Sequence, residues 1–114
     1  MAVFELKLSD PWFTLVDLGI KTVEGRLNRG KFKSIEVGDI ISWSNDDFWP
    51  RKCISKVTAK RYYKSFEEMA EKEGIHKVLP SLIHKYHVES VYRKYYTEDE
   101  EHAFGVVALE LNFI

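Results

Sequence analysis

The sequence has little cysteine, proline or glycine, and no long hydrophobic run. Its 114 residues include one cysteine, three prolines and six glycines. A single cysteine excludes an internal disulfide and any multi-cysteine metal site, and the alternating stretch around Cys53 predicts a packed thiol. The first residues lack the apolar core of a signal peptide, and no segment approaches the length of a membrane span. We therefore expect an intracellular protein, cytoplasmic or nuclear, with no membrane partner.

An excess of charge of either sign is also missing. The 17 lysines and arginines nearly cancel the 18 aspartates and glutamates, so no global charge draws the chain to nucleic acid or to a membrane. The charges are nevertheless unevenly distributed. Five basic residues lie between Lys21 and Lys33, where Glu24 is the only acid, whereas residues 98–101 are all acidic. A neutral total can therefore hide one cationic surface, which is typical of an anion-binding site.

The chain contains enough hydrophobic residues, 45% of the total, to form one core, which predicts a single domain over residues 1–114. Apolar alternation predicts strands at residues 3–8, 22–27 and 52–63. Apolar runs predict buried strands at residues 40–43 and 104–113, the second nearly all apolar in its first half and therefore buried on both faces. Capping residues predict helices after Asp10, Ser65 and Thr97, and apolar spacing predicts another over residues 88–96. Several short strands, with one at each end of the chain, indicate a small closed or nearly closed barrel decorated by helices.

The strand predicted at residues 22–27 carries an unusual set of charges. Residues two apart share a face of a strand, so Thr22, Glu24 and Arg26 point one way, and the alternate residues form an apolar face. Lys21 lies at the junction with the preceding helix and can reach the polar face. One interpretation is a solvated strand face with a surface Glu24–Arg26 pair. The other is a ligand-binding cleft.

Motifs spread along the chain resemble the ASCH domain, the activating-signal-cointegrator homology family of the PUA-like superfamily. They are Asp10-Pro11-Trp12, then Gly19-Ile20-Lys21-Thr22-Val23-Glu24-Gly25-Arg26, then Val37-Gly38-Asp39 with Ile41, and the closing strand. The resemblance implies an α+β fold, a small PUA-like β-barrel of about five to six mostly antiparallel strands decorated by three to four short helices. It also implies a cleft beside the Lys21-Thr22-x-Glu24-x-Arg26 strand that takes RNA or a nucleotide-like ligand.

Carried over by motif position, the cleft residues are Lys21, Thr22, Glu24 and Arg26, with Trp12 near the wall. Lysine and arginine can contact phosphate or a base edge, and a glutamate can accept a hydrogen bond from a base amino group. Any of the three tryptophans could stack on a base, although a core role is favoured for each one taken singly. Arg29 and Lys31 are expected to extend the positive rim, with Lys33 beyond them.

An enzymatic alternative follows from the same resemblance. Small bacterial relatives remove the acetyl group from acetylcytidine nucleosides with a lysine, a threonine and a glutamate, and other relatives are reported to cut RNA. The lysine corresponds to Lys21 and the distal glutamate to Glu73, but Glu24 stands where those enzymes have the threonine. Thr22 is the nearest substitute hydroxyl. The catalytic residues of this chain, as a hydrolase or ribonuclease, would be Lys21, Glu24 and Glu73.

No cofactor or metal site is predicted. His84 and His87 have helical spacing, but no third ligand accompanies them, and the chain contains no Walker loop, dinucleotide fingerprint or G-x-S-x-G motif. The aromatic stretch at residues 91–96 is interpreted as core residues with solvent-reaching lysine. The protein is expected to be a monomer. The sequence leaves open the identity of the ligand and whether it is bound or turned over.

Overall fold

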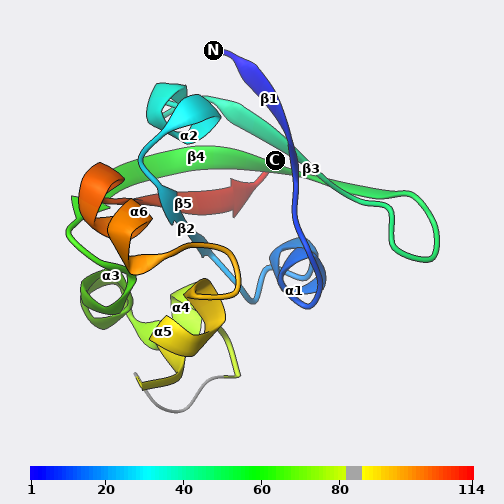
Figure 1. Cartoon of the computed structure of the whole chain (residues 1–114). Helices are drawn as coiled ribbons and strands as arrows, with labels where there is room; N and C mark the ends of the chain where they lie inside the picture. Colours follow the sequence, from blue (N-terminus) through cyan, green and yellow to red (C-terminus); the bar gives the residue numbers. More distant parts are fainter. Residues whose placement is uncertain (82–85) are drawn as a thin grey trace.

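A five-stranded sheet forms the centre of the structure (Figure 1). The computed structural model describes residues 1–81 and 86–114. The sheet has the order β1-β3-β4-β5-β2, with β1 and β3 parallel and the other neighbours antiparallel. It curls into a half-barrel, which confirms the predicted α+β fold of mostly antiparallel strands. The strands are β1 (Val3–Lys7), β2 (Val23–Leu27), β3 (Ile40–Asn45), β4 (Arg51–Tyr63) and β5 (Val106–Phe113).

The described residues form six short helices, more than the three to four expected. Two of them, α2 and α4, have only five and four residues, too few for an apolar periodicity to mark them in the sequence. Two of the three predicted caps are present: Ser65 accepts from the Glu68 backbone amide, and Thr97 forms a reciprocal capping box with Glu100. The prediction of Asp10 as the first cap is wrong, because Pro11 occupies the N-cap position of that helix and makes no side-chain cap hydrogen bond. The helices are α1 (Trp12–Asp17), α2 (Gly30–Ser34), α3 (Phe66–Glu73), α4 (Ile75–Val78), α5 (Tyr86–Tyr92) and α6 (Glu98–Phe104).

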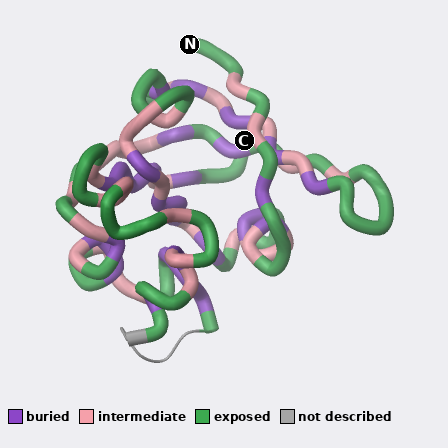
Figure 2. Tube along the Cα trace, viewed as in Figure 1, coloured by how far each residue is buried: buried purple, intermediate pink, exposed green. Residues whose placement is uncertain are grey.

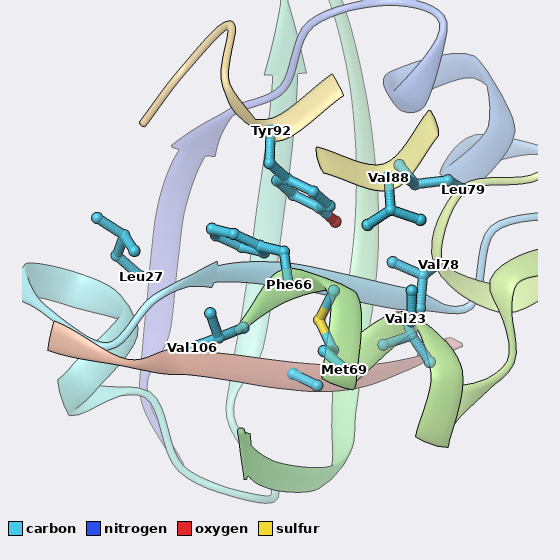
Figure 3. Packing of buried hydrophobic residues seen from close by; sticks show 11 residues of the cluster. Val23, Leu27, Phe66, Met69, Val78, Leu79, Val88, Tyr92 and Val106 are labelled. Carbon is cyan, nitrogen blue, oxygen red and sulfur yellow. The ribbon is translucent and has the colours of Figure 1, made fainter. Parts of the chain in front are cut away.

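Two hydrophobic clusters lie on opposite faces of the sheet, and β5 separates them. Val106 and Ala108 pack with the side chains of α3, α4 and α5, whereas Val107 and Leu109 pack with α1 and with the inner residues of β3 and β4. Figure 3 shows the first cluster, with Phe66 and Met69 between the helices and the sheet. Because both faces are covered, β5 is buried from Val106 to Leu109, as its continuous apolar sequence predicted.

Side chains of β2 and of α2 join the edge strand β1 to the other edge of the sheet. Arg26 of β2 donates from Nη2 to the Lys7 carbonyl at 3.3 Å, and Lys31 of α2 donates from Nζ to the Glu5 carbonyl at 3.2 Å. Both carbonyls belong to β1. The opening of the half-barrel therefore lies between β1 and β2, where polar side chains and backbone face each other.

The hairpin between β3 and β4 extends away from the rest of the molecule (Figure 1). Residues 46–50 at its tip are all exposed, as Figure 2 shows. Phe48 and Trp49 are 94% and 62% exposed, whereas Trp43 on β3 is fully buried. The three tryptophans thus have different environments, since Trp12 on α1 is half-buried and packs against both core clusters.

Candidate ligand-binding site

A cavity of about 240 Å³ opens at the free edge of β2, between the end of β1, the start of α1 and the segment that contains α5. Its wall is mainly apolar and aromatic. The strand contributes Glu24, Gly25 and Arg26, and Lys7 and Ser9 complete the polar part of the lining. Concave apolar walls with a few placed polar groups are typical of small-molecule sites. The apolar and aromatic lining residues are Leu8, Trp12, Leu79, Val91, Tyr92, Tyr95 and Tyr96.

Three of the predicted residues form a buried ion network beside this cavity. Glu24 Oε1 lies 3.2 Å from Lys21 Nζ, and Glu24 Oε2 accepts from Arg26 Nε at 3.0 Å. Lys21 and Glu24 are 2% and 4% exposed. Because these side chains are buried, the structure contradicts the interpretation of a solvated strand face. In a medium of low dielectric such a network is far stronger than a surface ion pair, and breaking it costs far more free energy.

Lys21 has no donor left for a ligand. Its Nζ donates to the Val23 carbonyl at 2.6 Å and to the Val78 carbonyl, and the Glu24 carboxylate lies at ion-pair distance. Three oxygens for three N–H groups match an ammonium rather than a neutral amine. Burial lowers the pKa of Lys21, and the neighbouring Glu24 opposes that shift. Lys21 does not line the cavity. Its contacts instead fix the position of Glu24 and link α4 to the start of β2.

Glu24 is charged and acceptor-only. Burial acts to raise the pKa of its carboxyl, but Lys21 and Arg26 outweigh burial and hold the pKa below the ordinary value. Among the described residues each carboxylate oxygen has one side-chain partner, so it keeps acceptor capacity. Arg26 keeps part of its guanidinium for a ligand, since its side chain is 21% exposed and Nη1 has no hydrogen bond among the described residues.

Three other predicted binding residues lie outside the cavity lining. Thr22 is half-buried, and its amide donates to the Lys77 carbonyl at 3.1 Å. Arg29 pairs with Glu100 at 2.9 Å and lies over the Phe104 ring. Lys31 is exposed, with the bond to β1 described above. Of the residues predicted to contact a ligand, Trp12, Glu24 and Arg26 are thus brought together at the cavity.

The structure does not bring Glu73 to Lys21 and Glu24. The Glu73 carboxylate accepts from Arg61 Nε at 2.5 Å, from Arg61 Nη2 at 2.7 Å and from the Tyr63 hydroxyl at 2.5 Å. The Arg61 hydrogen bonds hold the pKa of the Glu73 carboxyl below its ordinary value, although partial burial opposes them. Glu73 is also absent from the cavity lining. Its contacts are those of a structural link between α3 and β4.

Sequence reasoning missed the aromatic wall. Tyr92, Tyr95 and Tyr96 line the cavity, but their stretch was interpreted as core. Tyr92 and Tyr96 do pack against the first cluster, so that interpretation was correct in part. Three tyrosines within five residues were the available signal. The face they form could not be located without the path of the chain after Tyr92, where α5 ends.

Acid is expected to destabilise the fold through Glu24 and Glu73, whose carboxyls both have lowered pKa values. As the pH falls through the ordinary pKa of 4.5, the unfolded chain takes up protons on these carboxylates before the folded chain does. The contribution of the two carboxylates to the free energy of unfolding is therefore complete above that pH and is lost as the pH falls. The measurement is the free energy of unfolding in urea between pH 7 and pH 3. A free energy that stays level to pH 3 would contradict the charged network.

The curled sheet, the helices packed against it and the cavity at the β2 edge define a PUA-like domain. The chain belongs to the ASCH domain family, whose model matches residues 6–114. Two solved structures are similar over nearly the whole chain. The crystal structure of the hypothetical protein PH0355 is 38% identical, covers 100% of both chains and has a TM-score of 0.88. The solution NMR structure of protein PF0455 from Pyrococcus furiosus is 37% identical, covers 96% of both and has a TM-score of 0.78.

A search of curated proteins gave no significant match. Within residues 1–81 and 86–114, no group of three or more histidine, cysteine, aspartate or glutamate side chains is placed to hold a metal ion. His84, which was considered with His87 as a metal ligand pair, lies outside the described residues. None of the described helices has the length and apolarity needed to cross a membrane. Cys53 is half-buried, and burial raises the pKa of its thiol to about 11.

Proposed function

We propose that this protein binds one nucleobase, as a modified nucleoside or as part of an RNA, in the cavity at the β2 edge. The observation that carries the proposal is the combination of aromatic walls with a fixed carboxylate and guanidinium. Aromatic side chains stack on bases, and the polar pair offers both an acceptor and a donor to a base edge. Membership of a family associated with RNA binding supports the same ligand class.

The size of the cavity favours a single base over a long groove. Pockets for drug-sized ligands generally have volumes of roughly 300–1,000 Å³, and the 240 Å³ here lies just below that range. A nucleoside would place its base between Trp12 and the tyrosines and leave its sugar near the mouth. Lys7, which is exposed and lines the cavity, is placed to meet a phosphate there.

Binding is better supported than hydrolysis. An acyl transfer of the kind predicted from the sequence needs a nucleophile beside a base. Lys21 is enclosed by three oxygens, Thr22 does not line the cavity, and Glu73 is held by Arg61. Of the three predicted catalytic residues, Lys21, Glu24 and Glu73, only Glu24 lines the space that a substrate would occupy, so the three do not converge there. We assign Lys21 a positioning role, since it acts on a ligand through Glu24.

Tryptophan fluorescence gives a direct test, because Trp12 lines the cavity. Titration with nucleosides, acetylcytidine included, and with short single-stranded RNA should give saturable quenching. Base–aromatic stacking contributes about 1–3 kcal/mol, so Trp12→Ala is expected to weaken binding by roughly 5-fold to 150-fold. Because this variant lacks the reporting tryptophan, its affinity is measured by calorimetric titration. Chromatography of the incubated mixtures shows whether any substrate is also turned over.

The matched control is Trp49→Ala, which removes an exposed tryptophan at the hairpin tip, outside the cavity lining. It should bind like the wild type. Loss of affinity in Trp49→Ala with full affinity in Trp12→Ala would place the site on the hairpin instead. Circular dichroism of both variants ensures that folded proteins are compared.

A further inference from the structure

A second hollow, of about 210 Å³, lies on one face of the three strands β1, β3 and β4. It is the face turned away from the hydrophobic cluster that packs with α1, since the alternate residues Phe4, Ile41 and Trp43 pack in that cluster. The charged side chains of the hollow are exposed and its two serines are half-buried, so this part of the sheet is open to solvent. The lining residues are Glu5, Leu6, Lys7, Ser42, Ser44 and Lys52.

The register of the strands aligns Lys7, Ser44 and Lys52 in one row across this face. Neighbouring strands lie about 4.8 Å apart, so the backbones of the two lysines are separated by roughly 10 Å, with the serine between them. In the next row Ser42 lies beside Glu5. Small side chains on the central strand, with long ones on both neighbours, give the face its concave shape.

The two lysines of this row are available to an anion. Within residues 1–81 and 86–114 neither Lys7 nor Lys52 lies at ion-pair distance from a carboxylate. The strand β4 itself contains five basic residues and no acidic one between residues 51 and 63. Each lysine offers three N–H donors on a flexible stem, and a serine hydroxyl can donate as well. Lysine and serine side chains are common donors to the phosphate oxygens of nucleic acids, so the row is complementary to a phosphate chain.

Lys7 connects this hollow to the cavity at the β2 edge, because it lines both. It is the last residue of β1, and its carbonyl accepts from Nη2 of Arg26, a residue of the cavity, at 3.3 Å. A ligand with its base in the cavity and a phosphate at Lys7 therefore continues onto the outer face of the sheet. Ser44 and then Lys52 follow there in the same row.

On the basis of the proposed function, we infer that the preferred ligand is a single-stranded RNA whose sugar–phosphate chain crosses the hollow from Lys7 to Lys52. One base lies in the cavity, out of the stack, as the splayed bases of single-stranded RNA do when proteins bind them. One phosphate contacts Lys7, and the next contacts Ser44 and Lys52. The Glu5 carboxylate repels phosphate, so it bounds the path on the side of Ser42.

Calorimetric titrations with cytidine, uridine and adenosine, and with the RNA tetramer of each, test this inference. At low salt each tetramer that binds should do so at least ~10-fold more tightly than its nucleoside. A plot of log affinity against log salt concentration should have a slope of about −1.4 for the tetramer, because each neutralised phosphate of a single strand contributes about −0.7. The nucleoside carries no phosphate and should show no such dependence.

Lys52→Ala separates the hollow from the cavity, whose lining does not include Lys52. It should weaken tetramer binding by roughly 3-fold to 5-fold at low salt, reduce the size of the salt slope by about 0.7 and leave the nucleoside affinity unchanged. Glu5→Gln should have the opposite effect and raise the tetramer affinity by about 2-fold. Lys72→Ala, which removes an exposed lysine of α3 outside both hollows, should change none of these quantities.

The outcomes separate the inference from the proposed function. A tetramer that binds no more tightly than its nucleoside, or that binds Lys52→Ala as it binds the wild type, overturns the inference while base binding in the cavity stands. Equal losses of tetramer and nucleoside affinity in Lys52→Ala also overturn it, since the residue would then act through the fold and not through the RNA chain. If neither the nucleosides nor the tetramers bind the wild type, the proposed function fails together with the inference.

Discussion

Replacement of Lys21 by methionine is expected to lower the free energy of unfolding by about 3–5 kcal/mol, as loss of one partner from a buried ion pair typically does. Methionine fills much of the same volume but donates no hydrogen bond. The Val23 and Val78 carbonyls lose the Lys21 donor, and within the described part of the chain the buried Glu24 carboxylate keeps only Arg26 as an ion-pair partner. Since small domains are stable by only about 5–15 kcal/mol, this variant should lose a large share of its stability.

Urea denaturation measures this effect, with Lys31→Met as the matched control. Lys31 is an exposed lysine that makes one hydrogen bond to the Glu5 carbonyl. Its replacement should change the free energy of unfolding by no more than about 0.5 kcal/mol, as surface substitutions usually do. Equal losses in the two variants would mean that the Lys21 ammonium is not the structural centre of the network.

Replacement of Glu24 by glutamine should produce the largest loss of ligand affinity. Hydrogen bonds to charged groups contribute about 1.5–3 kcal/mol, which corresponds to roughly 10-fold to 150-fold in the dissociation constant. The amide keeps the shape of the side chain, but its NH₂ group must face Lys21, Arg26 or the ligand, all of which donate there. The measurement is calorimetric titration with the nucleoside that the wild type binds best.

Glu100→Gln is the control for that experiment. Glu100 also pairs with an arginine, Arg29 at 2.9 Å, but it does not line the cavity. Its variant should bind the nucleoside with wild-type affinity. Glu24→Gln will also be less stable, so both titrations belong at a temperature where circular dichroism shows the variant folded. Undiminished affinity in folded Glu24→Gln would remove Glu24 from the proposed site.

The sheet was predictable because alternation is local. Each of the five strands follows an apolar pattern in its own residues, and the caps at Ser65 and Thr97 lie beside the helices they start. The one-turn helices α2 and α4 were missed because so few residues cannot show a helical period. The curling of the sheet came from the family resemblance rather than from any single strand.

The candidate site was predictable only in part, for a physical reason. Spacing placed Glu24 and Arg26 on one face of β2, where they form an ion pair. The burial of Lys21 depends on the Val78 carbonyl, 57 residues away in the chain, so no local pattern could reveal it. The motif match also placed Glu73 at the site. The structure instead binds the Glu73 carboxylate to Arg61, a contact between α3 and β4 that no local pattern reveals.

The most direct test of base binding in the cavity is a nuclear magnetic resonance titration of the ¹⁵N-labelled wild type with cytidine or adenosine. The account predicts saturable chemical-shift changes concentrated in the amides of Glu24 to Arg26, in the Trp12 side chain, and in the amides of four residues around the end of α5. All of these residues border the cavity, the last four being Val91, Tyr92, Tyr95 and Tyr96. Changes confined to residues 46–50 of the exposed hairpin tip, or no saturable change, would contradict it.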